Sequence, residues 1–514
     1  MKEADTIALP HLGPEEVGVE DPWGEDRAVR PAGERAAAHR RRAPHTSRWR
    51  VAAWLVPALL MGVLGAVRAG TPGLRMEELA TWRSATSSWR DSWSALYGGD
   101  GTTTPYHLLM RGWAEVFGAS DLALRVPSIL ALVAAAALLG ATAARMFAPV
   151  TGVLAGVILA LLPASTRYAQ EAQPYALTLL AAVLATWLLL SAVDRPRLWR
   201  FAAYGGAVAV LGLGHVLALL LLLGHGWAVF AFRRGVAGRW LVAASVGALP
   251  AAALVWLAVR DGGRIFPMSR PSLTALAATP KELFGVAALA ALLLGLALLS
   301  LPLRYSAAVF TAWAAVPPLV LLLVAQVTPI WSPQCLLFTL PAWATLGAAA
   351  LSRVRARWSV GMVAVIALIG APVQVAARAP DGHAQDPRRL AKIIDGRLQP
   401  GDGVIYGSGD AGNGSDIRNV VAHYLRADRR PADVLPLPAP VVKGGRPTAG
   451  CADVAGCLRG VRRLWVIRVG ERTDPVPPIG GGAEALLRSR YHVAQVWRPT
   501  GFTLALLVDE RTDL

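Results

Sequence analysis

The chain has 514 residues, of which 54% are hydrophobic and 17% are charged, and its mean hydropathy is +0.44. This composition excludes an ordinary soluble protein, whose surface needs more polar residues, and it predicts a polytopic α-helical membrane protein. The formal net charge of +17 does not indicate nucleic-acid binding, because basic residues cluster at the ends of apolar segments, as in cytoplasmic loops. These clusters lie at residues 40–42, 195–200, 233–239 and 353–357.

Residues 1–48 are rich in Pro, Gly, Glu and Arg and show no periodicity, which predicts a disordered cytoplasmic tail. The apolar segments that follow are long enough to cross a bilayer, and they predict a transmembrane domain over residues 49–377. We expect about eleven transmembrane helices, and the division of residues 201–232 into two helices is the least distinct. The expected spans lie near residues 51–69, 124–145, 149–164, 175–193, 201–215, 216–232, 240–259, 283–302, 306–326, 335–351 and 358–377.

Residues 378–514 form the third predicted part of the chain. With the tail in the cytoplasm, an odd number of spans places this part outside, and the basic clusters then fall on the inner side. The segments GVIYGS and RLWVIRV are typical of buried strands, and DIRNVVAHYLRA is typical of a helix, so a small α/β domain is predicted. The expected protein is a multi-pass protein of the cell membrane, with a cytoplasmic N-terminus and an extracytoplasmic C-terminal domain.

Residues 70–123 form a long predicted external loop after the first span. Its segments ELATWRSATSSWRDSW and TPYHLLMRGWAEVFG are amphipathic, and their tryptophans fit helices that lie at the membrane surface. Glu77 and Glu78 follow the first span closely, and Asp100 lies farther along the same loop. A carboxylate at a membrane surface can act as a general base. Alternatively, the acidic pair stabilises the first turn of a helix that begins at Leu79.

The segment RYAQEAQPYAL, at residues 167–177, is a second polar stretch, and it lies between two predicted spans on the same side as the first loop. Arg167, Glu171 and Tyr175 are spaced four apart, so on a helix they would share one face. One interpretation is an ion pair at the mouth of a helical hairpin, with Tyr168 and Tyr175 as interfacial anchors. The other is a polar wall for a lipid headgroup, in which arginine binds phosphate oxygens and the carboxylate and amides bind sugar hydroxyls.

Four blocks of residues, in this order, carry a resemblance to a known family. They are the pair Glu77-Glu78, Asp100 with YHLLMRGW at 106–113, FGASDLALRVPS at 117–128, and RYAQEAQPYAL. Over roughly residues 50–350 the chain resembles the family 39-type, protein O-mannosyltransferase-like membrane glycosyltransferases of the GT-C fold class. The resemblance implies an enzyme that transfers mannose, or a related hexose or pentose, from a polyprenyl-phosphate carrier with inversion. The acceptor would be a hydroxyl of a cell-envelope glycan, lipid or protein on the extracytoplasmic face.

The resemblance also implies roles for residues of these blocks. Glu77 would be the catalytic base, and Glu78 and Asp100 would be the other catalytic acids. The donor-binding residues would be Arg167, Tyr168, Gln170, Glu171, Gln173 and Tyr175, and the acceptor-binding or positioning residues would be Tyr106, His107 and Arg125.

The expected partners are the polyprenyl-phosphate sugar, the cell-envelope acceptor and the lipid bilayer, and the oligomeric state stays open. Glu77 and Asp100 leave room for a divalent cation, Mg²⁺ or Mn²⁺, which the chemistry does not require, because a lipid phosphate is already a workable leaving group.

The sequence departs from the family pattern in three places, the last of which is a pair of adjacent residues. Glu77 stands where the family usually has aspartate, Gln173 where it has arginine, and Gln334 with Cys335 where it often has Arg-Tyr. The two missing cations leave a second hypothesis open, a catalytically degenerate relative that acts as a scaffold or lipid-binding partner. A transporter is less favoured, because transporters place ionisable groups within their spans, and the spans here are nearly free of charge.

The cysteines and two histidines give weaker signals. Cys451 and Cys457 lie close together in CADVAGC, so they can form a disulfide if this region is outside the cytoplasm. Cys335 begins an apolar segment and is expected to be packed there. His215 and His225 are expected to be packing or loop residues rather than metal ligands.

Overall fold

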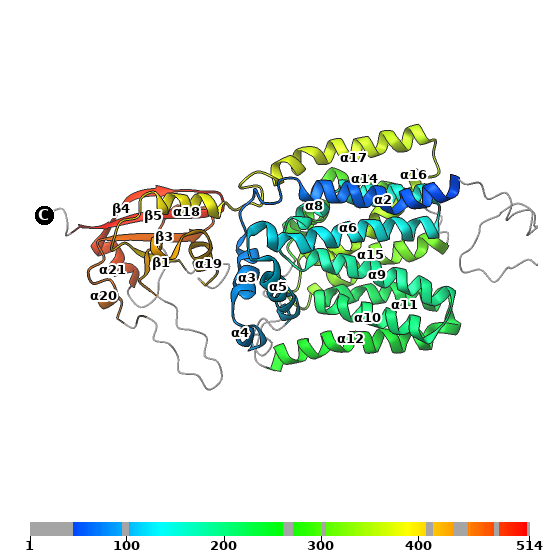
Figure 1. Ribbon diagram of the computed structural model, residues 1–514, viewed down its shortest axis with the longest axis horizontal. Helices are drawn as coiled ribbons and strands as arrows, with labels where there is room; N and C mark the ends of the chain where they lie inside the picture. The colour runs from blue at the N-terminus through cyan, green and yellow to red at the C-terminus, as the bar shows by residue number, and fades with distance from the viewer. Residues whose placement is uncertain are drawn as a thin grey trace, which may run out of the picture.

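The computed structural model of the protein describes residues 45–94, 102–260, 271–300, 305–407, 415–435, 451, 453–476 and 483–510. A long helical bundle occupies one end of the molecule, and a domain built on a β-sheet occupies the other (Figure 1). The predicted disordered tail lies, up to residue 44, outside the described residues.

The bundle contains long apolar helices and several short 3₁₀ segments. In chain order these are α2 (His45–Ala66), α6 (Asp121–Met146), α7 (Pro149–Leu161), α8 (Pro163–Ala169), α9 (Tyr175–Asp194), α10 (Leu198–Gly214), η2 (Val216–Leu220), α11 (Leu221–Phe232), η3 (Arg234–Val236), α12 (Ala237–Arg260), α13 (Leu273–Phe284), α14 (Ala287–Leu299), α15 (Tyr305–Ala325), η4 (Pro333–Thr339), α16 (Leu340–Leu351) and α17 (Ala356–Ala377).

Within the described residues, 7 helices are long and apolar enough to cross a membrane, or up to 9 if two bent pairs each count as one span. The bent pairs are α7–α8, at 67°, and α13–α14, at 80°. α10 and the η2–α11 segment are shorter apolar helices at the places of the predicted spans 201–215 and 216–232. The expected count of about eleven spans is therefore not confirmed.

The two bends lie at the end of the predicted span 149–164 and at the start of the predicted span 283–302. α7 ends before Pro163, which starts α8 at a position where a missing N–H costs nothing. α13 ends at Gly285, whose φ of 87° lies in the left-handed region that stops a helix, so the next helix begins only at Ala287. The sequence analysis did not predict α8 and α13, the short helices on the other side of these bends, as separate helices.

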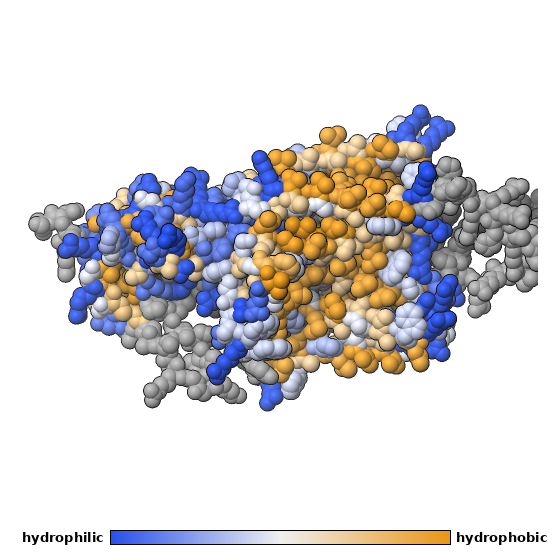
Figure 2. Space-filling model, viewed as in Figure 1, coloured by the Kyte–Doolittle hydropathy of each residue, from blue (hydrophilic) through white to orange (hydrophobic). Residues whose placement is uncertain are grey.

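On the face of the bundle that Figure 2 shows, apolar residues form a broad band, and hydrophilic residues gather at both of its ends. Large apolar side chains such as Val246 and Leu249 on α12 and Leu368 on α17 are exposed on this band. Helices satisfy their own backbone hydrogen bonds, so such a surface is stable in lipid and unfavourable in water. The bundle is a multi-pass membrane domain.

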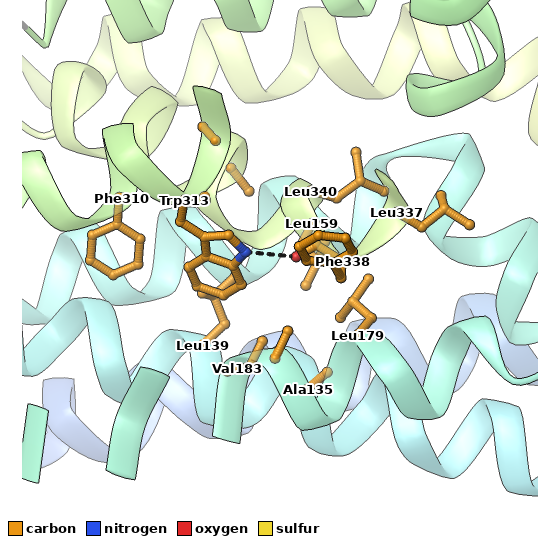
Figure 3. Packing of buried hydrophobic residues seen from close by; sticks show 14 of the residues in the cluster. Ala135, Leu139, Leu159, Leu179, Val183, Phe310, Trp313, Leu337, Phe338 and Leu340 are labelled. Carbon is orange, nitrogen blue, oxygen red and sulfur yellow. Dashed lines mark hydrogen bonds between the residues drawn. The ribbon is translucent and has the colours of Figure 1, made fainter. Parts of the chain in front are cut away.

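The bundle interior is packed with interdigitating apolar side chains. Trp313 of α15 lies among Leu139, Val183 and Phe310, and its indole N–H donates to the carbonyl oxygen of Phe338 in η4, at 3.0 Å (Figure 3). This bond satisfies both the buried indole and a carbonyl in an irregular segment. It fixes η4 against α15, and η4 carries Gln334 and Cys335.

His225 is a buried packing residue, as predicted. Its ring nitrogens lie 3.1 Å from the Thr186 hydroxyl and 3.1 Å from the Tyr204 hydroxyl, and Trp240 Nε1 donates to Tyr204 at 3.0 Å. These contacts satisfy the imidazole inside the bundle and join α9, α10, α11 and α12.

The first loop contains the helices that the sequence predicted. They are α3 (Met76–Thr86), α4 (Trp89–Ser94) and α5 (Thr104–Phe117). All three lie at the end of the bundle that faces the sheet domain (Figure 1).

The C-terminal domain has a mixed five-stranded sheet of order β2-β1-β3-β5-β4. β1 is parallel to β2 and β3, while β5 is antiparallel to β3 and β4. Its elements are α18 (Pro387–Asp395), β1 (Gly403–Tyr406), α19 (Ser415–Tyr424), η5 (Ala427–Arg429), β2 (Ala432–Asp433), α20 (Val454–Cys457), β3 (Arg463–Val469), α21 (Ala483–Arg490), β4 (Tyr491–Trp497) and β5 (Phe502–Asp509). The two predicted strands and the predicted helix are confirmed as β1, β3 and α19.

The cysteines behave as the sequence suggested. Cys451 and Cys457 are joined by a disulfide, which closes a short loop beside α20. Cys335 is buried and unpaired with another cysteine.

Polar contacts fix the sheet domain to the bundle. Asp121, at the start of α6, accepts hydrogen bonds from His423 at 2.7 Å and from Tyr424 at 2.9 Å, both at the end of α19. Arg388 of α18 also pairs with Asp121, and it donates to the carbonyl oxygens of Gly70 and Thr71 at 2.9 and 3.0 Å. The sheet domain therefore contacts the segment that leads into α3.

Candidate active site

The candidate site begins at the first turn of α3, whose geometry depends on residues far away in sequence. Glu78 caps this turn by accepting a hydrogen bond from the backbone N–H of Arg75, at 3.0 Å. The backbone N–H of Leu74 donates to the Tyr424 hydroxyl at 2.7 Å, and that of Met76 donates to Gln385 Oε1 at 2.9 Å. The C-terminal domain thus holds the backbone that presents the acidic pair.

Glu78 is buried and fully bonded. Its two oxygens accept from Nε and Nη2 of Arg125, both at 2.9 Å, and Oε1 also accepts from the backbone N–H of Ala172, at 2.9 Å. Burial favours the neutral acid, but the charge of Arg125 outweighs it and holds the pKa of Glu78 well below its usual range. Glu78 is therefore an ionised link between α3, α6 and the turn after α8.

Arg125 is as deeply buried as Glu78. Its Nη1 donates to the carbonyl oxygens of Ala69 and Pro72, both at 2.8 Å, and its Nη2 donates to that of Gly73, at 3.0 Å. The guanidinium thus holds the whole segment from the end of α2 to α3. His383 also lies here, with Nδ1 3.9 Å from Glu78 Oε2, and the sequence gave no signal for it.

Glu77 differs from its neighbour in exposure and contacts. Its side chain is 57% exposed, and Oε1 lies 3.4 Å from Nη2 of Arg75. Because the first turn of α3 is fixed through Glu78, the backbone of the adjacent Glu77 is fixed, while its carboxylate remains accessible.

Arg75 joins Glu77 to Glu171. Its Nη1 lies 3.4 Å from Glu171 Oε1, and the same oxygen accepts a hydrogen bond from Arg167 Nε at 3.0 Å. Burial alone would lower the pKa of Arg75, but the charges of Glu171 and Glu77 outweigh it and raise that pKa. The first loop and the RYAQEAQPYAL segment therefore meet, with two carboxylates on one guanidinium.

Arg75 is a site residue that the sequence analysis missed. It stands two positions before the acidic pair, and that proximity was the available signal. The predicted ion pair of Arg167 with Glu171 is present.

The turn after α8 departs from the single helix face that spacing suggested. α8 ends at Ala169, Gln170 leaves the helical conformation, and α9 starts only at Tyr175. Pro174 cannot donate a backbone hydrogen bond, which favours a new helix start over a continuous one. Gln170 is buried beneath the turn, where its amide donates to the carbonyl oxygens of Gly65 and Val67, both at 2.9 Å.

An aromatic wall continues from the ion pairs toward η4. The Arg167 guanidinium lies 5.7 Å from the centroid of the Tyr168 ring, and this ring meets that of Tyr175 edge to face at 5.4 Å. The Tyr175 hydroxyl donates to Gln334 Oε1 at 3.1 Å. Gln334, which replaces a cation of the family pattern, therefore lies at the same wall as Arg167.

His215 and Cys335 lie at the far end of this wall. The His215 ring stacks on Tyr175 with centroids 6.0 Å apart, and His215 Nε2 is 3.5 Å from Cys335 Sγ. Gln173 is half-buried in the turn beside the wall.

Two of the remaining predicted residues, Tyr106 and His107, lie on α5. Tyr106 is buried, and burial together with the charge of Glu78 raises the pKa of its hydroxyl well above the usual range. His107 is half-buried, and its ring lies 6.0 Å from that of Tyr106. Asp100 lies outside the described residues, so the structure does not place it. Among the residues that are described, no group of three or more His, Cys, Asp and Glu is arranged to hold a metal ion.

Comparisons with known proteins bear on the family and the fold of the chain. The family model for dolichyl-phosphate-mannose-protein mannosyltransferase matches residues 105–256. The crystal structure of ArnT from Cupriavidus metallidurans in the apo state is similar, with a TM-score of 0.57 and 13% identity over 88% of this chain and 97% of that one. The structure of the same protein bound to undecaprenyl phosphate gives a TM-score of 0.53 and 13% identity over 88% and 98%. A search of curated proteins finds no match.

The chain therefore has the fold of a GT-C glycosyltransferase, and the predicted resemblance is confirmed at that level. At 13% identity the likeness shows the fold, and the chemistry has to be argued from the residues of this chain.

Proposed function

We propose that the protein is a membrane glycosyltransferase that uses a polyprenyl-phosphate sugar as donor. The observation that carries this proposal is the meeting of Glu77 with Glu171, Arg75 and Arg167 at the end of the bundle that faces the sheet domain. Glu77 is an accessible carboxylate beside one guanidinium, Arg75, which Glu171 links to a second guanidinium, Arg167. This arrangement suits a substrate with a lipid tail, a phosphate and a sugar.

The donor headgroup lies along the α8–α9 turn in this proposal. Arg167 contacts a phosphate oxygen, because its side chain is 38% exposed and its guanidinium has donors beyond the one that Glu171 accepts. Tyr175 is half-buried and packs on the buried Tyr168 ring, and it offers an aromatic face of the kind that packs against sugar rings. Gln173 and Gln334 supply amide groups for hydroxyls, while Gln170 supports the turn from below.

The reaction is a single displacement with inversion. The acceptor hydroxyl oxygen attacks the anomeric carbon and forms the new glycosidic bond, while the bond from that carbon to the phosphate oxygen breaks. The electron pair of the broken bond stays on the phosphate, and the hydroxyl proton passes to the Glu77 carboxylate. Arg167 stabilises the negative charge that develops on the leaving phosphate.

Glu78 and Arg125 position the base. Their buried ion pair fixes α3, so Glu77 is presented to the acceptor without large movements. Tyr106, His107 and Asp100 are assigned to the acceptor side or to support of the acids, since they belong to the same loop.

We assign the reaction to the extracytoplasmic face, with a cell-envelope glycan, lipid or protein as acceptor. The lipid phosphate bound to ArnT supports a carrier of this class, and the mannosyltransferase family model supports mannose or a similar sugar.

The test is a turnover assay on the protein in lipid nanodiscs. Polyprenyl-phosphate mannose, glucose and arabinose are supplied in turn with a short-chain glycan or glycolipid acceptor, and release of polyprenyl phosphate is measured. We expect turnover of at least one donor. Saturable lipid binding with no turnover of any donor, across a broad set of acceptors, would contradict the proposal.

A second candidate is a lipid-binding relative without turnover. Gln334 favours it, because an amide that accepts a hydrogen bond from Tyr175 occupies the place of a family cation. Restoring both cations with Gln173→Arg and Gln334→Arg tests this candidate. A large gain in transfer would identify a weakened enzyme, whereas tighter lipid binding without transfer would identify a binding protein.

A further inference from the structure

Arg75 makes the longest ion-pair contacts of the residues in the site. Its side chain is 17% exposed, and its two Nη atoms lie 3.4 Å from oxygens of Glu77 and Glu171. Charge-assisted bonds of guanidinium to carboxylate are usually 2.7–2.9 Å long, as the bonds of Arg125 to Glu78 are at 2.9 Å. The Nε of Arg75 is buried and has no hydrogen-bond partner in the described part of the chain.

The Arg75 guanidinium therefore makes two long ion-pair contacts through its Nη atoms, and its Nε–H is unused among the described residues. Glu171 does not depend on it, because Arg167 Nε reaches the same Glu171 oxygen at 3.0 Å. In the described part of the chain, Glu77 forms its ion pair with Arg75, and that contact is long and half exposed. The weakest link of the cluster is thus the one between Arg75 and the proposed base.

The charges of the four side chains suggest how a donor phosphate would affect the contact between Arg75 and Glu77. Arg75 and Arg167 carry two positive charges, and Glu77 with Glu171 carry two negative charges, so the four side chains are neutral together. A phosphate that arrives beside them competes with the two carboxylates for the guanidinium groups. A planar guanidinium can offer Nε and one Nη to a phosphate in a bidentate contact. Arg75 has the unused Nε, and its Nη2 is the one that Glu77 holds.

We propose that the donor phosphate displaces Glu77 from Arg75, so that donor binding itself releases the base. The proposal rests on the proposed function and deepens it, because it adds Arg75 as a phosphate-binding residue and sets an order of binding. Before the donor is bound, Oε1 of Glu77 is paired with Arg75, so this oxygen is not free for an acceptor hydroxyl. After the donor phosphate takes Arg75, the Glu77 oxygen is free to accept that hydroxyl proton. The donor therefore binds before the acceptor is activated.

A double-mutant cycle on lipid-phosphate binding tests this directly. The probe is undecaprenyl phosphate in nanodiscs, and its dissociation constant is measured for the wild type, Arg75→Gln, Glu77→Gln and the double variant. Arg83→Gln is the matched control, because Arg83 is an exposed cation on the same helix.

We expect Arg75→Gln to weaken binding by about tenfold or more, because a charge-assisted contact is lost. Glu77→Gln should strengthen binding roughly two- to fivefold, because Arg75 is no longer shared with a carboxylate. This gain should disappear in the Arg75→Gln background. Arg83→Gln should bind like the wild type.

Two results would overturn the proposal. An equal gain from Glu77→Gln with and without Arg75 would show simple repulsion between carboxylate and phosphate, and Arg75→Gln binding that matches Arg83→Gln would remove Arg75 from the phosphate site. If Arg75→Gln unfolds, the same cycle with Arg75→Lys decides, because lysine keeps the charge and loses the bidentate geometry. Sugar transfer is measured separately, so transfer that needs Glu77 while lipid binding ignores Arg75 would leave the proposed function standing without this inference.

Discussion

Glu78 and Arg125 are joined by two parallel hydrogen bonds of 2.9 Å, and their side chains are 1% and 0% exposed. This pair connects the first turn of α3 to the second span, α6, and through Ala172 to the turn after α8. The two polar segments that the sequence singled out are thus held together by an ion pair inside the protein. Because this pair fixes the first turn of α3, it also fixes the backbone of the exposed neighbour, Glu77.

Breaking the pair should destabilise the protein strongly. Glu78→Gln leaves a buried guanidinium without its counter-charge, and loss of one partner of a buried pair costs about 3–5 kcal/mol. The effect is measured as a shift in the midpoint of thermal unfolding in detergent. Unfolding is followed by the reaction of a thiol reagent with Cys335, which is buried in the folded protein. The matched control is Glu115→Gln, because Glu115 forms an exposed pair with Arg111 and should contribute less than about 1 kcal/mol.

The same pair predicts a dependence of stability on pH. The folded-state pKa of Glu78 is held well below the unfolded value of about 4.3. Its contribution to stability is therefore fully present above that value, and it is lost progressively as pH falls toward the folded pKa. Between pH 7 and pH 3 the wild type should lose more thermal stability than Glu78→Gln. Parallel pH profiles for the two proteins would contradict the assignment.

Docking of the sheet domain should depend on Asp121. This carboxylate accepts hydrogen bonds from His423 and Tyr424 and pairs with Arg388, so Asp121→Asn leaves cationic and polar partners poorly matched. The expected cost is about 1–3 kcal/mol, and it should appear as faster proteolysis of the segment 378–386. Asp428→Asn is the control, because Asp428 pairs with Arg426 at the exposed surface. Equal cleavage rates for both variants would show that Asp121 does not fix the domain.

The hydrogen bond from Tyr175 to Gln334 should affect donor binding more than the chemical step. Tyr175→Phe removes only the hydroxyl, keeps the ring against Tyr168, and releases the Gln334 amide. We expect KM for the donor to rise about 2- to 10-fold with kcat nearly unchanged, as for loss of one neutral hydrogen bond. A fall in kcat with KM constant would instead place the hydroxyl at the reacting atoms.

Short sequence patterns predicted the features that depend on neighbouring residues, namely the helices, the strands and one ion pair. Apolar runs gave the helices, buried apolar stretches gave β1 and β3, and the spacing of Arg167 and Glu171 gave an ion pair. The sequence did not predict the sharp bends at Pro163 and Gly285, because the angle between two helices depends on tertiary packing.

The site itself depends on contacts that no short pattern encodes. The start of α3 is bonded to Gln385 and Tyr424, which lie more than 300 residues away in the chain. The difference between Glu77 and Glu78 likewise arises from Arg125 on another helix. Sequence spacing identified the acidic pair, and only the fold distinguishes the exposed acid from the buried one.

The most direct test of the account is the rate of sugar transfer by Glu77→Gln in lipid nanodiscs, with Glu115→Gln measured beside it. Loss of a general base should lower kcat by about 10²- to 10⁴-fold, while binding of lipid phosphate is retained and Glu115→Gln transfers normally. A Glu77→Gln variant that transfers sugar within twofold of the wild-type rate would contradict the central claim that this carboxylate accepts the hydroxyl proton.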